Sequence, residues 1–316
     1  MMTTTPTPTS LCVVRQPAKP GTDEWARLVT ASKVAGIVGE SHYATPYSVW
    51  NTMNGIRIDE PGMEDRFLTG HAMEHALAYW WAAKNPEWRL SRGEVQVTNP
   101  ALPFPNAATL DRVTTMVNRS RGPKHSRCLQ FKTVRDWEEY QALTAETLPV
   151  DWLIQETWEM LCSGLTQYPA IIVVAGPYYE WREFEVPYDP EFAAELCAAV
   201  RDFLTTLDGE PPAPTAPADY RIAKARHPEI DDDADPVILD ADVAAEWDRA
   251  KTESKTAAAA KRAADKRADV AGAVILEALG RASTAVDSDG EVCAKRIATK
   301  RGIQLRHVPL PVGDGS

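Results

Sequence analysis

Hydrophobic residues recur at helical spacing in some segments of this chain and at a spacing of two in others. The helical pattern, with its capping residues, predicts helices at residues 22–29, 30–38, 46–55, 65–84, 149–165, 190–207 and 242–279. Residues 136–148 fit either a polar helix or a loop. Alternation and β-branched runs predict strands at residues 88–98, 109–113, 127–133, 170–175 and 181–186. This order predicts a mixed α/β sandwich.

Two of these strands are predicted to pair as a hairpin. The segment from Asn118 to Ser126, which contains Gly122-Pro123, is rich in turn-forming residues and joins residues 109–113 to residues 127–133. Asp111 then faces the neighbouring strand. Side chains alternate along a strand, so we expect Gln130 and Lys132 on one face and Phe131 on the other.

Composition suggests how the chain is divided. Residues 1–20 are rich in proline and threonine, which predicts a disordered arm. Residues 21–207 form the predicted α/β domain. Residues 208–220 hold four prolines and are predicted to be a linker. Residues 221–316 are predicted to form a C-terminal helical arm with a small hairpin.

Charge and cysteine content exclude several classes of protein. The net charge of −11, from 34 basic and 45 acidic residues, argues against a simple basic nucleic-acid coat. The five cysteines form no CxxC pair, so neither a disulfide framework nor a thiolate metal site is indicated. The sequence contains neither an HxH nor an HExxH pattern, so a zinc site is not indicated. The absence of a long apolar run or signal region predicts a cytoplasmic protein with no membrane contact.

The predicted hairpin places the ligands of a hard cation beside an amine. Mg²⁺ prefers carboxylate, carbonyl and water oxygens, which Asp111, the Gln130 side chain and the Phe131 backbone can supply. Lys132 would then orient or deprotonate a water that attacks a phosphodiester. The alternative is an exposed hairpin with ordinary polar residues.

Two polar residues on predicted helices add context. Glu74 lies on or beside the apolar stripe of residues 65–84, where a carboxylate is costly unless it is paired or bound to a cation. It is a candidate ligand of a second ion, or the partner of Arg66 or Arg112. Gln155 lies in a Trp-rich stripe and either positions a water or phosphate or is a satisfied core glutamine.

Several ordered segments between Trp25 and Val186 resemble the phage lambda exonuclease and YqaJ-type viral recombinase family of the PD-(D/E)xK nuclease superfamily. The segments are Trp25 with Leu28-Val29-Thr30-Ala31-Ser32, similar to the family's W…L…ITAS; Gly70-His71-Ala72-Met73-Glu74, similar to GxxxE; Thr109-Leu110-Asp111, similar to SPD; Gln130-Phe131-Lys132, similar to ExK; and the following helix with Gln155. The resemblance implies a mixed central sheet flanked by helices, with a mainly helical C-terminal extension.

The resemblance also implies roles for individual residues. Asp111 would bind Mg²⁺, with Mn²⁺ as a substitute, Lys132 would serve the nucleophilic water, Glu74 would help to bind a second ion, and Gln155 would support the cleft. The 5′-phosphate of a DNA end would be held by Ser32, Arg27 and Thr109. The alternative for Ser32 is a plain helix cap.

Two positions depart from the family pattern. Leu110 replaces a proline that shapes the strand without touching metal. Gln130 replaces a glutamate, and this amide keeps an oxygen ligand but removes one negative charge, so metal affinity should fall.

A basic cluster lies on and beside the predicted turn. Positive charge next to a phosphodiesterase site predicts contacts with the DNA backbone, whereas the alternative is a solvated loop. The cluster comprises Arg112, Arg119, Arg121, Lys124, His125 and Arg127.

The first hypothesis is a Mg²⁺-dependent exonuclease that degrades one strand of linear duplex DNA from its 5′ end and leaves a 3′ single strand for a single-strand annealing protein. The resemblance implies a ring-shaped homo-oligomer, a trimer or tetramer, around DNA. The second hypothesis is a DNA-end-binding or recombination scaffold whose catalysis Gln130 has weakened. A third is a structure-specific endonuclease, which would also cut closed circular DNA.

Overall fold

The computed structural model describes residues 11–19, 21–56, 63–117, 125–300 and 302–310. It forms two compact units, Met1–Ile230 and Asp231–Ser316. The helices of the first unit are α1 (Asp23–Arg27), α2 (Ala31–Ile37), α3 (Pro46–Met53), α4 (Met63–Lys84), α5 (Trp137–Ala142), α6 (Val150–Ser163), α7 (Pro190–Thr205) and α8 (Asp219–Arg226), with a 3₁₀ turn at Pro177–Tyr179. Its strands are β1 (Val29–Thr30), β2 (Trp88–Leu90), β3 (Val95–Val97), β4 (Asn106–Leu110), β5 (Arg112–Met116), β6 (Ser126–Thr133), β7 (Ala170–Ala175) and β8 (Trp181–Val186).

The strands of this unit form two sheets. The larger sheet has the order β2-β5-β6-β7-β8, in which β6 and β7 are parallel and the other pairs are antiparallel. The smaller sheet has the order β1-β4-β3. The predicted mixed α/β class is therefore confirmed, and the predicted hairpin is the β5–β6 pair, in which Arg112 faces Leu129.

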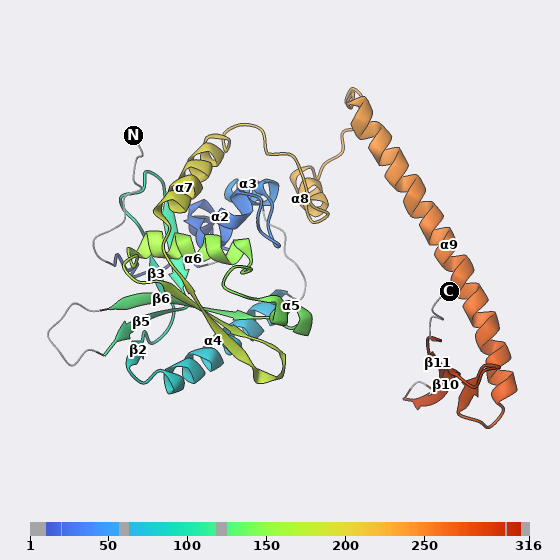
Figure 1. Cartoon of the computed structure of the whole chain (residues 1–316). Helices are drawn as coiled ribbons and strands as arrows, with labels where there is room; N and C mark the ends of the chain where they lie inside the picture. The colour runs from blue at the N-terminus through green and yellow to red at the C-terminus, as the bar shows by residue number, and fades with distance from the viewer. Residues whose placement is uncertain (1–10, 20, 57–62, 118–124, 301, 311–316) are drawn as a thin grey trace. The chain divides into compact units, whose positions relative to one another are not determined.

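Helices cover both faces of the larger sheet, with α4 on one side and α6 on the other (Figure 1). On the α4 side, Leu77 and Trp81 pack in one cluster with Phe131 and Val173. On the α6 side the main core holds members of α2, α6 and α7 together with strand residues such as Ile172. The sheet is buried on both faces, which explains the continuous apolar run of β7.

The structure corrects two sequence predictions at the start of this unit. The strand predicted at 88–98 is two strands in different sheets, because the chain turns at Ser91, whose Oγ accepts from the Val113 N–H and donates to the Gly93 carbonyl. The strand predicted at 109–113 is also divided, because β4 ends at Leu110 and β5, in the other sheet, begins at Arg112. Within the predicted N-terminal arm, Val13 forms a bridge with Val97. Residues 1–10 and 20 lie outside the described residues.

The first unit continues past the predicted linker. In α8, Asp219 is buried and accepts a 2.8 Å hydrogen bond from the Thr45 hydroxyl. The predicted domain bounds stay a prediction.

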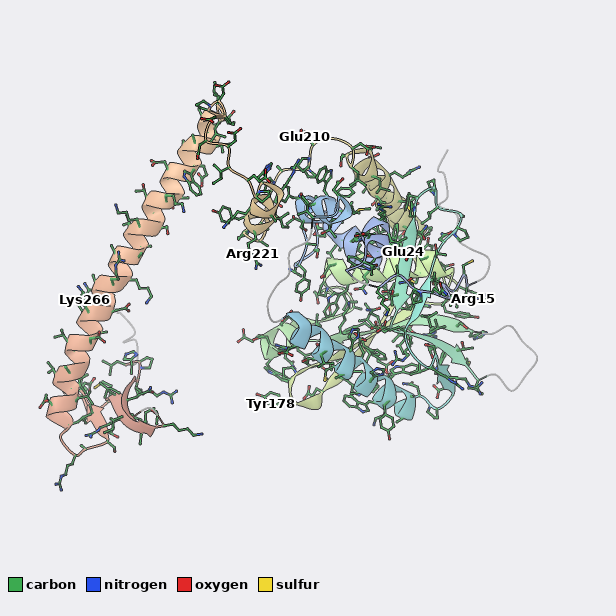
Figure 2. All side chains as sticks on the ribbon, turned by 180° about the vertical axis from the view of Figure 1, so that it is seen from behind. Arg15, Glu24, Tyr178, Glu210, Arg221 and Lys266 are labelled. Carbon is green, nitrogen blue, oxygen red and sulfur yellow. The ribbon has the colours of Figure 1, made fainter. Side chains whose placement is uncertain are left out.

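The second unit contains the predicted long helix and three short strands. Helix α9 (Ala241–Leu279) is mostly exposed along its length, and Figure 2 labels Lys266 on it. It ends at Gly280, as predicted. Strands β9 (Thr284–Val286), β10 (Val292–Thr299) and β11 (Gly302–His307) form an antiparallel sheet, so the predicted hairpin has a third strand. Among the described residues, no helix has the length and apolar character of a membrane span.

We expect Gly176→Ala to destabilise the first unit. A Cβ at Gly176 would lie 2.6 Å from the Tyr140 ring, and Tyr140 is fully buried. The overlap should lower the free energy of unfolding by about 1–3 kcal/mol, measured by denaturant unfolding. Gly209→Ala is the control because its Cβ would make only an ordinary 3.5 Å contact. Equal stability of the two variants would contradict the packing described here.

Candidate functional site

Asp111 lies where the two sheets separate. Strand β4 ends at Leu110 and β5 begins at Arg112, so Asp111 is the residue between a strand of the smaller sheet and a strand of the larger one. Its side chain is 8% exposed, and its Oδ2 accepts a 2.7 Å hydrogen bond from the Phe131 N–H on β6. The carboxylate therefore faces β6, as the sequence predicts.

Alternation along β6 separates its side chains as predicted. Phe131 packs in the cluster on the α4 side, whereas the Lys132 Nζ donates a 2.7 Å hydrogen bond to the Gln155 Oε1 on α6. The Gln155 Nε2 donates in turn to the Glu159 Oε1 at 2.9 Å. Gln130 is 4% exposed, and its Oε1 has no hydrogen-bond partner among the described residues. The structure thus brings Asp111, Gln130, Lys132 and Gln155 to one region.

Negative charge is concentrated around Asp111. The pKa of its carboxyl is raised from 3.8 to about 7, chiefly by burial and also by the Glu74 carboxylate, while the Phe131 N–H and the Lys132 ammonium act in the opposite direction. Desolvation and like charge both disfavour the ionised form, so the site favours a bound proton or cation.

Two acidic residues on α6 were not predicted as part of the site. Glu156 and Glu159 are both fully buried, and burial raises both pKa values, that of Glu156 to about 8. The signal in the sequence was that α6 is apolar on most of its surface, and acids on such a helix are forced into the interior.

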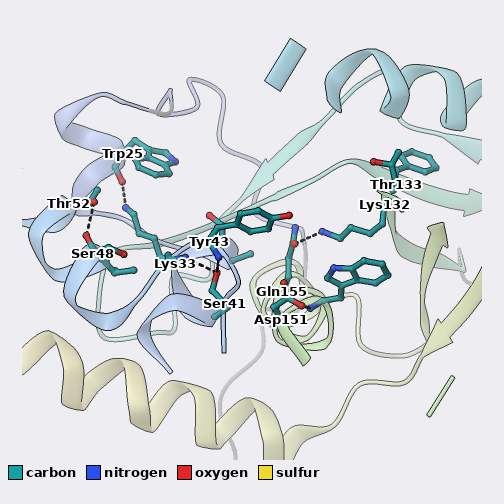
Figure 3. A pocket seen from close by; sticks show the side chains of 17 residues that line it. Trp25, Lys33, Ser41, Tyr43, Ser48, Thr52, Lys132, Thr133, Asp151 and Gln155 are labelled. Carbon is teal, nitrogen blue, oxygen red and sulfur yellow. Dashed lines mark hydrogen bonds between the residues drawn. The ribbon is translucent and has the colours of Figure 1, made fainter. Parts of the chain in front are cut away.

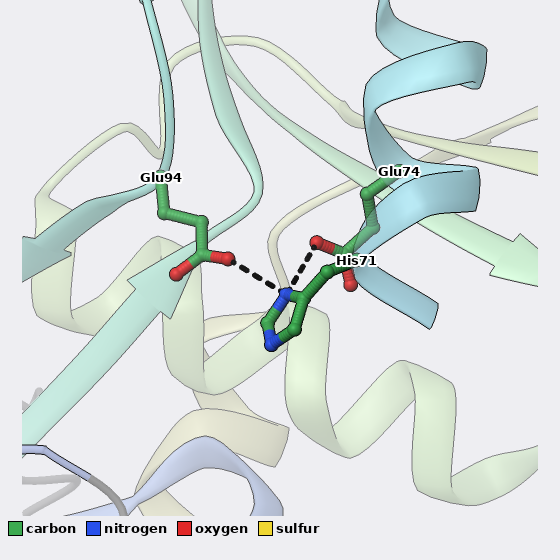
Figure 4. A group of neighbouring side chains, drawn as sticks. All are labelled: His71, Glu74 and Glu94. Atoms are coloured by element: carbon green, nitrogen blue, oxygen red, sulfur yellow. Dashed lines mark hydrogen bonds and ion pairs between the residues drawn. The ribbon is translucent and has the colours of Figure 1, made fainter. Parts of the chain in front are cut away.

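Glu74 belongs to a second group of potential ligands (Figure 4). The His71 Nδ1 lies 3.4 Å from a carboxylate oxygen of Glu74 and 3.4 Å from one of Glu94. One ligand atom from each of the three lies within 4.8 Å of the others. The Glu74 side chain is 25% exposed, and the nearby Arg112 contacts the His75 ring. Glu74 is thus placed to bind a cation near Asp111, with His71 and Glu94 as neighbours that the sequence did not indicate.

A cavity of about 440 Å³ opens beside Lys132. Figure 3 shows Lys132 and Gln155 pointing toward each other at its edge, with Tyr43 nearby. Ser32 also lines this cavity, so the structure places a candidate phosphate-binding hydroxyl in the same hollow as the candidate catalytic lysine.

The other two candidate phosphate ligands are not among the residues that line this cavity. Arg27 lines a different hollow, beside Met53 and Gly55. Thr109 is exposed on β4, where its hydroxyl accepts a 3.3 Å hydrogen bond from Gln96.

Next to Ser32 in the sequence, a buried lysine lies at the start of α2. The Lys33 Nζ donates to the carbonyls of Trp25, Ala26 and Leu28 at 2.7, 2.9 and 2.7 Å. Burial lowers its pKa to about 8. These bonds satisfy carbonyls at the end of α1 and fix the turn that leads into α2. The Thr30 side chain makes no capping bond to α2, but its hydroxyl lies 3.2 Å from that of Ser32.

Two arginines of the predicted basic cluster make contacts within the protein. Arg112 is buried, with hydrogen bonds to the Asp111 carbonyl and the His75 ring, so it is not part of an exposed DNA-binding surface. Arg127 donates a 2.6 Å bond to Glu185 and packs on the Trp88 ring. The candidate residues outside the described part of the chain are Arg119, Arg121 and Lys124.

No model of a known protein family matches this chain, and no curated protein matches it. Among solved structures, it is similar to the alkaline exonuclease LHK-Exo from Laribacter hongkongensis, with 17% identity, a TM-score of 0.43, and coverage of 66% of this chain and 100% of that one. LHK-Exo in complex with dAMP gives 18% identity, a TM-score of 0.43 and coverage of 65% and 97%. SSO0001 gives 12% identity, a TM-score of 0.33 and coverage of 62% and 81%. Likenesses of this strength assign neither a family nor an activity, so function must be argued from the site itself.

The buried acids predict an unusual dependence of stability on pH. The pKa of Glu156 is raised from 4.5 to about 8 in the folded protein, so its contribution to stability is complete below pH 4.5 and is lost as the pH rises toward 8. In the presence of a metal chelator, the free energy of unfolding of Glu156→Gln should therefore rise relative to that of wild type as the pH rises through this window, by at most about 1.4 kcal/mol per pH unit.

Thermal or denaturant unfolding at a series of pH values checks this difference. Glu195→Gln, an exposed position on α7, is the matched control and should track wild type. A difference between Glu156→Gln and wild type that does not change with pH would contradict the burial of an ionisable Glu156.

Proposed function

We propose that this protein is a Mg²⁺-dependent exonuclease that degrades one strand of linear duplex DNA from its 5′ end and leaves a 3′ single strand. One observation supports this most directly: a buried carboxylate is hydrogen-bonded to the backbone of β6, next to a buried amide oxygen without a partner among the described residues and next to a lysine amine, and this lysine lines a cavity. These groups are Asp111, Gln130 and Lys132. The same three were selected from the sequence by their resemblance to the D…ExK pattern.

The residues at this point fit a hard divalent cation. Within the part of the chain that the structure describes, no donor reaches the buried Gln130 Oε1, and an amide oxygen of this kind is a suitable ligand for Mg²⁺ or Mn²⁺. Asp111 supplies a carboxylate, the Phe131 carbonyl is a further proposed ligand, and Glu74 is proposed to help to bind a second ion. When bound, the metal would polarise a phosphate oxygen and lower the pKa of a water.

Lys132 is positioned to act on the attacking water. Its amine is held by Gln155 at the edge of the cavity, within reach of solvent. A lysine fixed in this way orients a water and offsets the negative charge that develops on the phosphate. Gln155 is therefore proposed as a positioning residue for Lys132.

The cavity suggests how a DNA end is selected. Ser32 and Lys132 line the same hollow, so a terminal 5′-phosphate bound at Ser32 would lie near the amine. Arg27 and Thr109 remain proposed phosphate contacts. A ring-shaped homo-oligomer and an annealing protein that receives the 3′ strand complete the proposal.

The competing function is a DNA-end-binding scaffold. Gln130 favours it, because a neutral amide at this position supplies less charge to a cation than glutamate does. A wild type with almost no activity that gains a large rate on Gln130→Glu would favour the scaffold, whereas an active wild type would exclude it.

We expect Asp111→Asn and Lys132→Ala each to lower Mg²⁺-dependent degradation of linear duplex DNA by at least about 100-fold. The first removes the carboxylate charge, and the second removes the amine beside the water. An end-labelled linear duplex, assayed with and without Mg²⁺, reports both rate and polarity. Lys84→Ala, an exposed residue at the end of α4, is the control. Full activity in either site variant, or equal cutting of closed circular DNA, would overturn the proposal.

Ser32→Ala should reduce the preference for a 5′-phosphorylated end over a 5′-hydroxyl end by about tenfold, because one hydrogen bond to a charged phosphate is lost. Activity on the 5′-hydroxyl substrate should change little. Ser41→Ala, in the same cavity, is the matched control for loss of a hydroxyl. An unchanged preference in Ser32→Ala would leave this serine as a structural residue of the α2 start.

A further inference from the structure

Two buried glutamates remain outside the reaction proposed above. Glu156 and Glu159 are both 0% exposed. Neither oxygen of Glu156 has a hydrogen-bond partner among the described residues, and the same holds for the Glu159 Oε2. A buried carboxylate without partners costs several kcal/mol unless it is protonated or bound by a cation, so this arrangement requires an occupant or a proton.

Gln130 points to the same side of the sheet. It is two residues from Cys128 and two from Lys132 along β6, so the three side chains share one face of the strand. Both neighbours contact α6: the Cys128 Sγ lies 3.5 Å from the Ser163 Oγ, and Lys132 binds Gln155. The Gln130 side chain therefore lies on the side of the sheet that α6 covers, and its Oε1 has no partner among the described residues. An amide oxygen is not relieved by taking up a proton at neutral pH. It needs a donor or a cation.

The two glutamates differ in their surroundings. The Glu159 Oε1 already accepts the Gln155 amide. Glu156 has no such partner among the described residues. Burial is the main cause of its raised pKa, and two groups of the candidate site also act on it: the Lys132 ammonium lowers the pKa and the Asp111 carboxylate raises it. Glu156 is thus the buried acid that is both unpaired and within electrostatic range of Asp111.

We propose that Glu156 supplies the carboxylate that position 130 lacks, so that Asp111, Glu156 and the Gln130 amide oxygen together form the oxygen ligands of the divalent cation. This inference rests on the proposed nuclease function. It explains why a glutamine is tolerated on β6: the second negative charge of the site comes from α6 instead of the strand.

The test is a double-mutant cycle in the full chain, read out as Mn²⁺ affinity by calorimetry at one fixed pH. Glu156→Gln should weaken Mn²⁺ binding by at least about tenfold, since a charged ligand is lost. Adding Gln130→Glu to that variant should return the affinity to within about threefold of wild type, because the carboxylate is restored on the strand. Nuclease activity should fall and recover in parallel.

Controls separate the possible results. Glu195→Gln on the exposed face of α7 should bind Mn²⁺ as wild type does. Thermal unfolding in chelator checks that Glu156→Gln is folded, and removal of a buried unpaired charge should not lower its stability. The rise in unfolding temperature on addition of Mn²⁺ gives a second measure of binding for each variant.

Several outcomes would overturn the inference. Unchanged Mn²⁺ affinity in Glu156→Gln, with loss of affinity in Asp111→Asn, would show that Glu156 is only a protonated core residue and would leave the proposed function intact. A larger loss of Mn²⁺ affinity in Glu159→Gln than in Glu156→Gln would show that Glu159, and not Glu156, is the ligand. Failure of Gln130→Glu to restore binding would show that the two positions do not share a cation. Full activity of Asp111→Asn would instead remove the nuclease proposal, and this inference with it.

Discussion

The hydrogen bond from the Phe131 N–H to the Asp111 carboxylate links the parts of the first unit on which the site depends. Asp111 stands at the point where the chain leaves the smaller sheet and enters the larger one, and Phe131 is a central residue of β6. This bond uses one carboxylate oxygen and keeps the side chain facing the strand that carries Gln130 and Lys132. Any movement of β4 relative to β6 would therefore move the acid away from the amine.

The surroundings of that bond bring several acidic side chains together. Helix α4 brings Glu74 to one side of Asp111, and α6 brings two further acids into the interior on the side that Lys132 faces. Lys132 is the cation that Asp111 and both buried glutamates share among the interactions described. One ammonium does not balance this many carboxylates, so the apoprotein has to hold protons that a divalent cation would displace.

Local patterns in the sequence were sufficient where an element is defined by its own residues. The strands at Ala170–Ala175 and Trp181–Val186 were predicted with the bounds that they have in the structure, because the first is a continuous β-branched run and the second largely alternates between apolar and polar residues. The placement of Gln130 and Lys132 on one face and Phe131 on the other was predicted from the same period of two.

Features that depend on distant partners were not predicted. The break between β2 and β3 follows from pairing with β5 and β4, which alternation alone does not reveal. Arg112 was expected at the surface, yet His75, distant in the sequence, lies beside it in the fold. Glu156 was missed because its importance comes from what lies opposite it, and the sequence indicates only that α6 is largely buried.

The link from Lys132 through Gln155 to Glu159 has a directional consequence. An ammonium only donates, so the amide has to turn its oxygen toward Lys132, and its nitrogen then donates to the Glu159 Oε1. A flipped amide would set donor against donor at Lys132. Gln155 therefore matches donor to acceptor at both of its ends. Through it, the buried Glu159, one helical turn along α6, helps to fix the position of the Lys132 amine at the cavity.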